Sequence, residues 1–178
     1  MGKTNKQAER SKRWLIDALF QLMKKQPFQK ISITEITDKA GVSRLTYYRN
    51  FTSKEEMILA YFDQEFDEFF KQYLIPNRKT MSLHEGIESV FTYWRKGSDK
   101  IELLMRDGLT HLISTPFQGY LQQCADKKII VHKYDENQRA FMEGGMFFLL
   151  LHWVKGGCLQ SPDELATLVE SMLKIDLS

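Results

Sequence analysis

Cysteine and histidine are scarce in this sequence, and neither is spaced as a metal site requires. The 178 residues include two cysteines, Cys124 and Cys158, and four histidines. The cysteines lie far apart, and no two histidines form a His-x-x-x-His or His-Glu-x-x-His pattern, so we predict neither a metal site nor a cofactor. Reduced, buried thiols explain the cysteines most simply, and a redox or ligand-reactive role is the alternative.

Long apolar runs are missing as well. The longest spans residues 146–151, with an extension to residue 154 that is interrupted by His152. This is about half of the roughly 20 residues that a membrane helix needs. The N-terminal stretch MGKTNKQAERSKRW is polar and lacks the apolar core of a secretion signal. We therefore expect a cytoplasmic protein without a membrane segment.

The motifs of common enzyme classes are also absent. The sequence contains no nucleophile elbow, no phosphate-binding loop, no paired-carboxylate constellation and no zinc motif. A small helical enzyme is therefore disfavoured, and we predict that the protein is not an enzyme.

What the sequence does have is an uneven distribution of charge. Residues 1–54 carry 12 Lys and Arg against 4 Asp and Glu, a balance of +8. Residues 55–178 carry 13 against 19, a balance of −6. A basic head on an acidic body is typical of a chain whose head meets a polyanion such as nucleic acid, although a solvated basic surface without function gives similar counts.

Helix signals dominate, and the alternation typical of a strand is almost absent, so we predict an all-α fold. Four Ser-x-x-Glu patterns, which are typical of capping boxes at helix N-termini, begin at Ser32, Ser53, Ser82 and Ser161. Together with apolar residues at helical spacing, they predict about nine helices. We expect these helices over residues 6–25, 33–40, 43–51, 53–75, 82–96, 99–107, 110–126, 136–156 and 162–174.

Two short helices joined by a tight turn at Gly41, and supported by the first helix, predict a helix-turn-helix arrangement. Tyr47 and Phe51 lie one turn apart and are expected to face inward. The opposite face of the same helix is then free to enter a major groove. We therefore predict a DNA-binding domain over residues 1–53, joined by a long fourth helix to a second helical domain over residues 54–178.

The chemistry of the outward side chains suggests what each would contact. Arg44 has the donor geometry for guanine O6 and N7, whereas Leu45 and the Thr46 methyl group suit a thymine methyl. The alternatives are a solvated Arg44, a Tyr48 packed on a neighbouring helix and a Ser32 that only caps its helix. The predicted DNA-binding residues, including those expected at phosphates, are Ser32, Thr34, Arg44, Leu45, Thr46, Tyr48, Arg49 and Lys54.

The stretch ISITEITDKAGVSRLTYYRNFTSKEEMILAYF resembles the DNA-binding domain of TetR/AcrR-type transcriptional regulators. The resemblance covers about residues 10–62, and the last two predicted helices are similar to one C-terminal type of that family. It implies a homodimer that binds a palindromic operator and releases it when a small molecule enters the C-terminal domain. It also implies that residues 54–178 are the ligand-binding and dimerisation domain, that Lys54 contacts a phosphate, and that the bases are contacted by Arg44, Leu45, Thr46 and Tyr48. The sequence departs from the family pattern at Tyr47, which stands where leucine is usual.

Two adjacent glycines interrupt the most apolar predicted helix, where each costs about 1 kcal/mol relative to alanine. Close approach of a partner helix would explain them, so we predict a four-helix dimer interface. A buried monomeric core with a local kink is the alternative. The predicted interface residues are Gly144, Gly145, Phe148, Leu151, Leu165, Leu168, Val169 and Met172.

Eight apolar residues between positions 91 and 147 are predicted to line a pocket for a small apolar or aromatic effector. Plain core packing is the alternative for each of them. The predicted pocket residues are Phe91, Trp94, Met105, Leu109, Phe117, Tyr120, Met142 and Phe147.

These patterns and the resemblance together predict a ligand-responsive, sequence-specific transcriptional repressor that binds double-stranded DNA as a homodimer. The alternative is a protein-interaction co-regulator of the same fold that does not bind DNA. The two differ in salt dependence, because neutralising phosphates makes affinity fall steeply with ionic strength.

Overall fold

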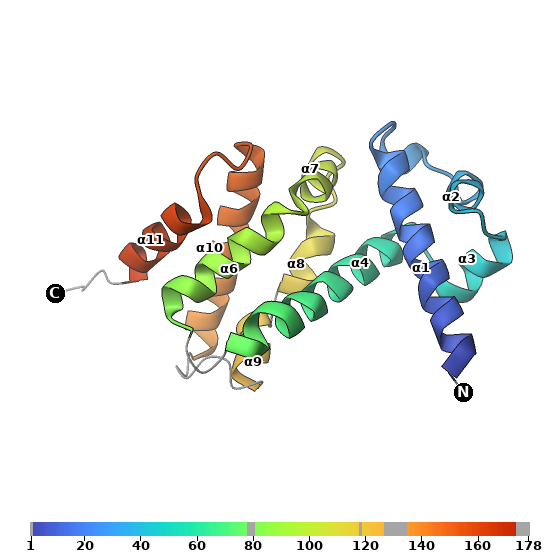
Figure 1. Ribbon diagram of the computed structural model, residues 1–178. Coiled ribbons are helices and arrows are strands. Elements are labelled where there is room, and N and C mark those ends of the chain that lie inside the picture. The colour runs from blue at the N-terminus through green and yellow to red at the C-terminus, as the bar shows by residue number, and fades with distance from the viewer. Residues whose placement is uncertain (1, 78–80, 118, 127–134, 174–178) are drawn as a thin grey trace.

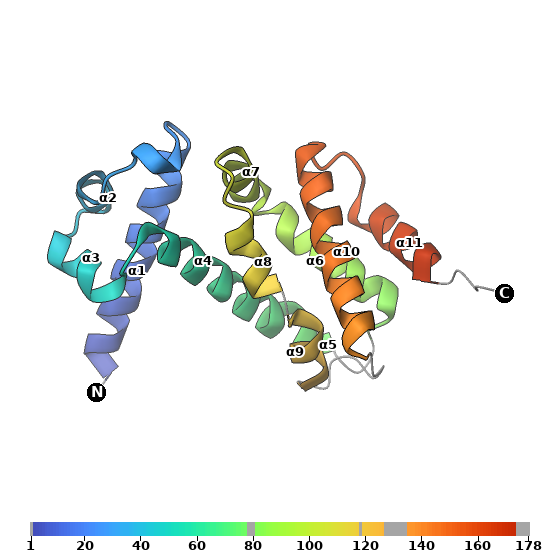
Figure 2. The same ribbon diagram turned by 180° about the vertical axis from the view of Figure 1, so that it is seen from behind.

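All regular structure that the computed structural model describes is helical, which confirms the predicted all-α fold. The described residues are 2–77, 81–117, 119–126 and 135–173. The first three helices form a head at one end of the molecule, and the last helix lies at the opposite end (Figure 1). Helix α4 (Lys54–Phe69) leads from the head along the body, as the view from behind also shows (Figure 2).

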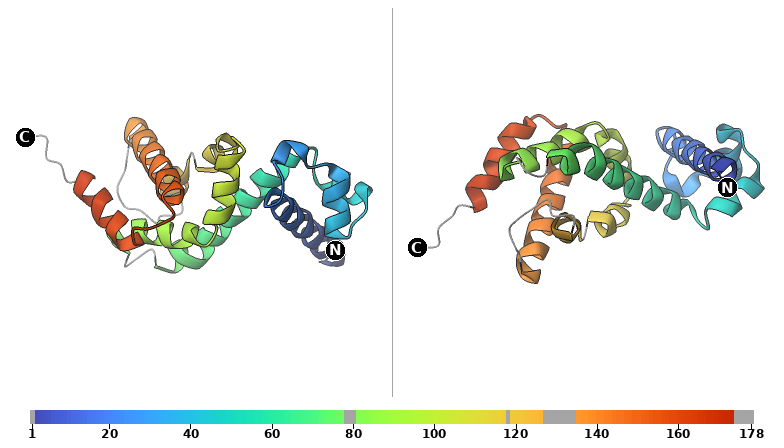
Figure 3. Two further views of the ribbon diagram at one scale, coloured as in Figure 1. Left: turned by 90° about the horizontal axis from the view of Figure 1, so that it is seen from above. Right: turned by 60° about the horizontal axis from the view of Figure 1, so that its bottom comes forward.

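The head consists of α1 (Gly2–Met23), a 3₁₀ turn (Phe28–Lys30), α2 (Ile33–Ala40) and α3 (Arg44–Asn50). The body contains α6 (Leu83–Arg95), α7 (Ser98–Arg106), α8 (His111–Phe117), α9 (Tyr120–Asp126), α10 (Glu136–Lys155) and α11 (Pro162–Leu173). Seen from above, α4 bridges the two parts (Figure 3). None of the described helices is both long and apolar enough to cross a membrane.

Serine caps start the helices close to where the sequence predicts them. Complete capping boxes, in which a serine and the glutamate three residues further on exchange hydrogen bonds, begin at Ser32, Ser82 and Ser161. Ser53 accepts the N–H of Glu56 at 3.1 Å, but the Glu56 carboxylate accepts hydrogen bonds from Thr52 instead. The fourth box is therefore only half formed.

The head is held together by apolar side chains from all three of its helices. Leu15 and Leu19 of α1 and Ile36 of α2 have no exposed surface. Tyr47 of α3 is likewise fully buried, and Phe51 is 3% exposed, which confirms that both face inward. A helix as short as α3 is unstable in isolation, so this packing is what keeps it folded.

Replacing Tyr47 by phenylalanine is expected to stabilise the protein. Among the described side chains, the Tyr47 hydroxyl is a buried polar group without a hydrogen-bond partner. A buried, unsatisfied hydroxyl costs about 1–3 kcal/mol, so Tyr47→Phe should raise the free energy of unfolding by about 1 kcal/mol. Thermal unfolding would show this as a melting temperature higher by about 2–4 °C.

The matched control for this substitution is Tyr48→Phe. Tyr48 is the next residue of α3 and is 54% exposed, so its hydroxyl is solvated and its loss should leave the melting temperature unchanged. A Tyr47→Phe protein that melts below the wild type would contradict the expectation.

An aromatic chain connects α4 to three helices of the body. Phe62 and Phe66 of α4 pack on Trp94 of α6, with ring centroids 5.7 and 5.0 Å apart. The ring of Phe117 on α8 lies 5.8 Å from that of Phe66, and the ring of Phe147 on α10 lies 5.5 Å from that of Phe117. Such pairs each add about 0.5–1.5 kcal/mol to the burial of their surface, so the rings join α4, α6, α8 and α10 into one core.

Two predicted helices have different boundaries in the structure. The segment expected as one helix over residues 110–126 is divided into α8 and α9, because Gly119 has a φ of +82°, which no right-handed helix contains. The fourth helix does not stop before Pro76, but continues through a π turn (Phe70–Leu74) into the short α5 (Ile75–Asn77). The wider turn fits because Pro76 has no N–H for the regular ladder.

Candidate nucleic-acid interface

Gly41 makes the sharp turn between α2 and α3. Its φ of +65° lies in the left-handed region that favours glycine. The N–H of Val42 bonds back to the Thr37 carbonyl at 3.0 Å and so closes the end of α2. Ser43 then caps α3 by accepting the N–H of Thr46 at 3.1 Å. These local bonds fix the angle at which α3 leaves the turn.

The face of α3 that was predicted to point outward is exposed. Leu45 is 58% and Tyr48 54% exposed, and both arginines of the helix lie at the surface. Within the described part of the chain, the guanidinium groups of Arg44 and Arg49 form no ion pair. The helix therefore exposes two unneutralised cations and a phenol, and their contact with DNA stays a prediction.

Thr46 is half-buried and already engaged. Its hydroxyl lies 2.9 Å from the Ser43 hydroxyl, and its carbonyl accepts a hydrogen bond from the Asn50 amide at 2.7 Å. The methyl group is therefore the part of Thr46 best suited to meet a base, and its contact with a thymine methyl stays a prediction.

Ser32 uses its hydroxyl inside the capping box of α2. The hydroxyl donates to the Glu35 carboxylate at 2.7 Å and accepts the Glu35 N–H at 3.2 Å. Hydrogen bonds from the Ser32 backbone and hydroxyl lower the pKa of Glu35 to about 2, so a negative charge persists at this helix end. The capping role of Ser32 is therefore observed, whereas its contact with a phosphate stays a prediction. Thr34, one position into the helix from Ile33, is exposed.

Lys54 turns toward the head and does not extend into solvent. Its ammonium donates to the carbonyls of Phe28 and Ile31 at 2.8 and 2.7 Å, and it lies 4.4 Å from the centre of the Phe28 ring. Burial lowers the pKa of Lys54, although the nearby Glu55 and Glu35 oppose this change. An ammonium has three N–H donors, so one of them is left for a phosphate oxygen after these two bonds.

Six of the eight residues predicted to line an effector pocket belong to the apolar core or pack against it. Five of them are nearly or fully buried, namely Phe91, Trp94, Leu109, Phe117 and Phe147. Met105 and Met142 are half-buried, and the side chain of Tyr120 lies outside the described part of the structure. The structure thus places six of the eight residues in or against the core, and the role of the set in ligand binding stays a prediction.

Two open hollows of the described surface lie away from this set. One, of about 360 Å³, lies in the head and is lined by Trp14, Asp17, Ala18, Gln21, Lys39, Ala40 and Gly41. The other, also about 360 Å³, is lined by Arg95, Ser98, Glu102, Val154, Gly157 and Cys158. Neither is lined by a predicted pocket residue.

The residues predicted for the dimer interface divide between the core and the surface. Leu165 and Val169 of α11 are 0% and 8% exposed, so they lie in the core of the single chain, where α11 packs along α6. Phe148 of α10 is 71% exposed, and Met172 of α11 is 59% exposed. Phe141 of α10 was not among the predicted interface residues, and it is 77% exposed.

The glycines of α10 lie on the same open side. A side chain added at Gly144 or Gly145 would meet no described atom within 4 Å. Packing within the chain therefore does not require glycine at these positions. The spacing of Phe141, Gly145 and Phe148 by four and three residues places them on one helix face with Gly144 beside them.

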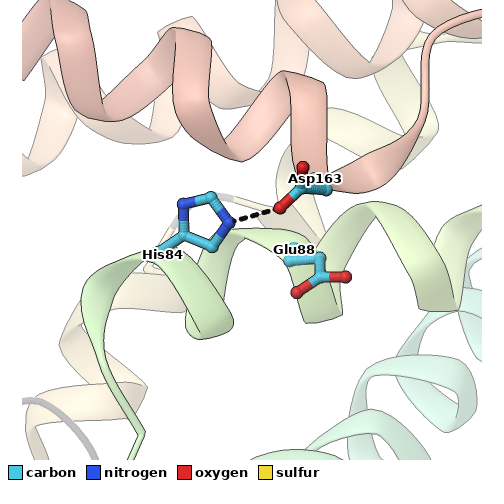
Figure 4. A group of neighbouring side chains, drawn as sticks. All are labelled: His84, Glu88 and Asp163. Carbon is cyan, nitrogen blue, oxygen red and sulfur yellow. Dashed lines mark hydrogen bonds and ion pairs between the residues drawn. The ribbon is translucent and has the colours of Figure 1, made fainter.

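One group of described residues could in principle hold a metal ion. The potential ligand atoms of His84, Glu88 and Asp163 lie within 4.8 Å of one another (Figure 4). The imidazole of His84 already bonds to Asp163 at 2.9 Å and to Glu170 at 3.2 Å, and these two bonds raise its pKa. A protonated His84 therefore satisfies both carboxylates and links α6 to α11 without a metal. The sequence did not reveal this group, because His84 and Asp163 are 79 residues apart.

The fold defines a class of protein, the all-helical proteins with an N-terminal helix-turn-helix. Residues 15–61 match the model of the bacterial regulatory proteins of the tetR family. A protein of Haemophilus influenzae named as an uncharacterized HTH-type transcriptional regulator is 26% identical over 107 residues. This alignment covers 57% of the chain and 52% of the relative, so the chain spans about half the length of that relative. Residues 15–61 are therefore similar to the N-terminal domain of the tetR family.

Solved structures share the whole fold. The dihydroxyacetone kinase operon activator DhaS is similar with a TM-score of 0.63 at 15% identity, over 92% of this chain and 93% of that one. The fatty acid degradation regulator FadR from Bacillus halodurans gives a TM-score of 0.65 at 17% identity, over 94% and 96%. The regulator FadR from Bacillus subtilis in complex with stearoyl-CoA gives 0.61 at 17%, over 93% and 99%. The likeness therefore extends through the C-terminal helices.

Proposed function

We propose that this protein is a sequence-specific DNA-binding transcriptional regulator whose α3 enters the major groove. The proposal is carried by one observation, the two exposed arginines of α3, a helix whose inward residues Tyr47 and Phe51 are buried in the head. A groove of B-DNA admits such a helix, and a basic head favours a polyanion. A regulator of this kind acts in the cytoplasm, where bacterial DNA lies.

The regulator acts as a homodimer in this proposal. One head with a seven-residue recognition helix offers few contacts, whereas two heads on successive major grooves, about 34 Å apart, read a palindrome. The open face of α10, with Phe141, Phe148 and the two glycines, supports the pairing because it offers apolar surface and room for close approach. Residues 1–53 would then be the DNA-binding domain and residues 54–178 the dimerisation and ligand-binding domain.

A small apolar effector completes the proposal, with repression as the default outcome. The aromatic core around Trp94, Phe117 and Phe147 supports an apolar or aromatic molecule, because inserting one would exchange ring contacts for ligand contacts. The B. subtilis FadR structure, which shares the fold, holds stearoyl-CoA, whose acyl chain is apolar. An effector that binds the DNA-free state more tightly than the DNA-bound state would release the operator.

Replacing Arg44 by alanine tests the DNA contact. The probe is a duplex that the wild-type protein selects from a random pool, and the measurement is a fluorescence anisotropy titration at fixed salt. Loss of a bidentate guanine contact costs about 1–3 kcal/mol, so we expect affinity to fall about 10- to 100-fold for each half-site and base preference to relax at one position.

Lys155→Ala is the matched control for this experiment. Lys155 is the last residue of α10 and is exposed, so the substitution removes one positive charge far from the recognition helix. Its effect on affinity should stay within about twofold. Equal effects of the two substitutions, or none from Arg44→Ala, would count against the assignment of α3.

The same titration separates the proposal from a co-regulator that binds protein through its head. When binding depends on phosphate contacts, the logarithm of the affinity falls linearly with the logarithm of the salt concentration. The steepness of this fall is close to the number of phosphates neutralised. A duplex affinity that does not change between low and physiological salt would favour the co-regulator.

A further inference from the structure

The C-terminal end of α7 meets the C-terminal end of α1 through two charged side chains. Asp107 accepts a hydrogen bond from the backbone N–H of Phe28 at 2.8 Å. Arg106 donates to the carbonyl of Met23, the last residue of α1, at 2.8 Å. The ends of helices leave backbone groups without partners, so this pair supplies the head with two bonds that the head cannot make itself.

The two side chains also bind each other. The Arg106 guanidinium forms bonds of 2.8 and 3.0 Å to the two carboxylate oxygens of Asp107. The Asp107 side chain is only 6% exposed, and its pKa is lowered by Arg106 and then by the Phe28 N–H. Charge-assisted, two-pronged bonds of this kind are stronger and more directional than neutral ones. The pair is therefore a rigid connector.

The residues on both sides of the connector are buried in the core of the body. Ile101 and Leu104 of α7 are 1% and 0% exposed, and Leu109, just beyond the pair, is 5% exposed. Gly108 has a φ of +73°, which turns the chain, and the Leu109 N–H bonds back to Leu104 at 2.8 Å. A shift of the head relative to α7 would have to break bonds at Asp107 or distort this corner.

The segment between α1 and α2, which the connector holds, leads directly into the helix-turn-helix of α2 and α3. Lys54 of α4 binds the carbonyls of Phe28 and Ile31, while Asp107, the residue after α7, binds the Phe28 N–H. The next residue, Ser32, caps α2, the helix on which α3 is set. The residues between α1 and α2 are thus held from two helices at once.

We propose that Arg106 and Asp107 are positioning residues, which lock the orientation of the DNA-binding head on the body and thereby set the separation of the two recognition helices. The proposal rests on the proposed function. In this proposal the pair acts through the backbone of residues 23–28 and not through a contact with DNA. Without the pair, each head can still bind a half-site, but the two heads are no longer held at one spacing.

Asp107→Ala tests the proposal with two readouts in the full-length protein. The first is amide hydrogen exchange at Phe28, followed by NMR without DNA. A lost bond to a carboxylate should speed this exchange about 10-fold or more, while the amide of Leu19 in α1 keeps its wild-type rate. A merely structural role would change both amides together.

The second readout is the dependence of affinity on half-site spacing. The probes are the duplex selected by the wild type and variants with one or two base pairs inserted between its half-sites. Each base pair rotates a half-site by about 36°, so wild-type affinity should fall about 10-fold per insertion, whereas Asp107→Ala should hold all probes within about threefold. Arg106→Gln, which leaves the buried carboxylate in place, is the second variant and should show the same loss of spacing preference.

Asp99→Asn is the matched control. The ion pair of Lys24 and Asp99, 2.8 Å long, also crosses from head to body, but its side chains are 56% and 52% exposed. Exposed pairs contribute little, so spacing preference and Phe28 exchange should remain those of the wild type.

The outcomes distinguish the two proposals. Unchanged Phe28 exchange together with unchanged spacing preference in Asp107→Ala and Arg106→Gln would overturn the positioning role. Failure of the wild type to select any duplex would overturn the proposed function and the effect on spacing, and the Phe28 exchange would still decide whether the pair holds the head.

Discussion

Replacing Phe148 by glutamate is expected to turn the proposed dimer into a monomer and to weaken operator binding by roughly 100-fold or more. Phe148 is 71% exposed on α10, beside the two glycines, where a partner helix is expected to approach closely. Burying an unpaired carboxylate on each side of such a contact costs several kcal/mol. The two heads would then bind independently, so the gain from binding both half-sites at once is lost.

Sedimentation velocity at micromolar protein would measure the first effect, and a titration with the selected duplex the second. Leu159→Glu is the matched control, because Leu159 is 89% exposed but lies in the connection between α10 and α11 and not on the glycine face. It should leave both measurements unchanged. A wild type that sediments as a monomer, or a Phe148→Glu protein that remains dimeric, would refute this interface.

Replacing Lys54 by methionine is expected to lower the free energy of unfolding by about 2–3 kcal/mol. The ammonium of Lys54 supplies hydrogen bonds to two backbone carbonyls, those of Phe28 and Ile31, and lies over the Phe28 ring. Methionine keeps the apolar stem of the side chain but leaves both carbonyls without these donors. Denaturant unfolding at neutral pH measures the change.

Lys30→Met is the control, since Lys30 lies in the same segment, is exposed, and should change stability by no more than about 0.5 kcal/mol. The salt dependence of duplex binding adds a second result. If the third N–H of Lys54 reaches a phosphate, the slope of log affinity against log salt should fall by about 1 in Lys54→Met. Unchanged stability would mean that the two carbonyl bonds contribute nothing in solution.

The sequence predicted best those features that depend on residues within one helical turn. The serine caps, the turn at Gly41 and the inward position of Tyr47 follow from spacings of three or four residues, and the structure contains all of them. The break at Gly119 was missed because glycine is tolerated inside helices, and only the backbone angle shows that this one ends a helix.

Features that depend on distant pairs could not be predicted. The bonds from Asp107 to Phe28 and from His84 to Asp163 each join residues 79 positions apart, and no local pattern relates them. The orientation of Lys54 is a similar case, because the sequence shows a lysine at a helix start but not the carbonyls it reaches. On α11, the apolar spacing of Leu165 and Val169 is the same whether their partner is another chain or α6 of their own, and in this chain both are buried.

Phe147 and Phe148 are neighbours on α10, with ring centroids 5.7 Å apart, yet one belongs to the aromatic core and the other faces outward. A molecule that enters the core and displaces the Phe147 ring would therefore strain the proposed subunit contact through a single peptide unit. We expect the two effector sites of a dimer to sense each other's occupancy. Gene expression would then respond to effector concentration with a sigmoidal curve and not with a simple hyperbola.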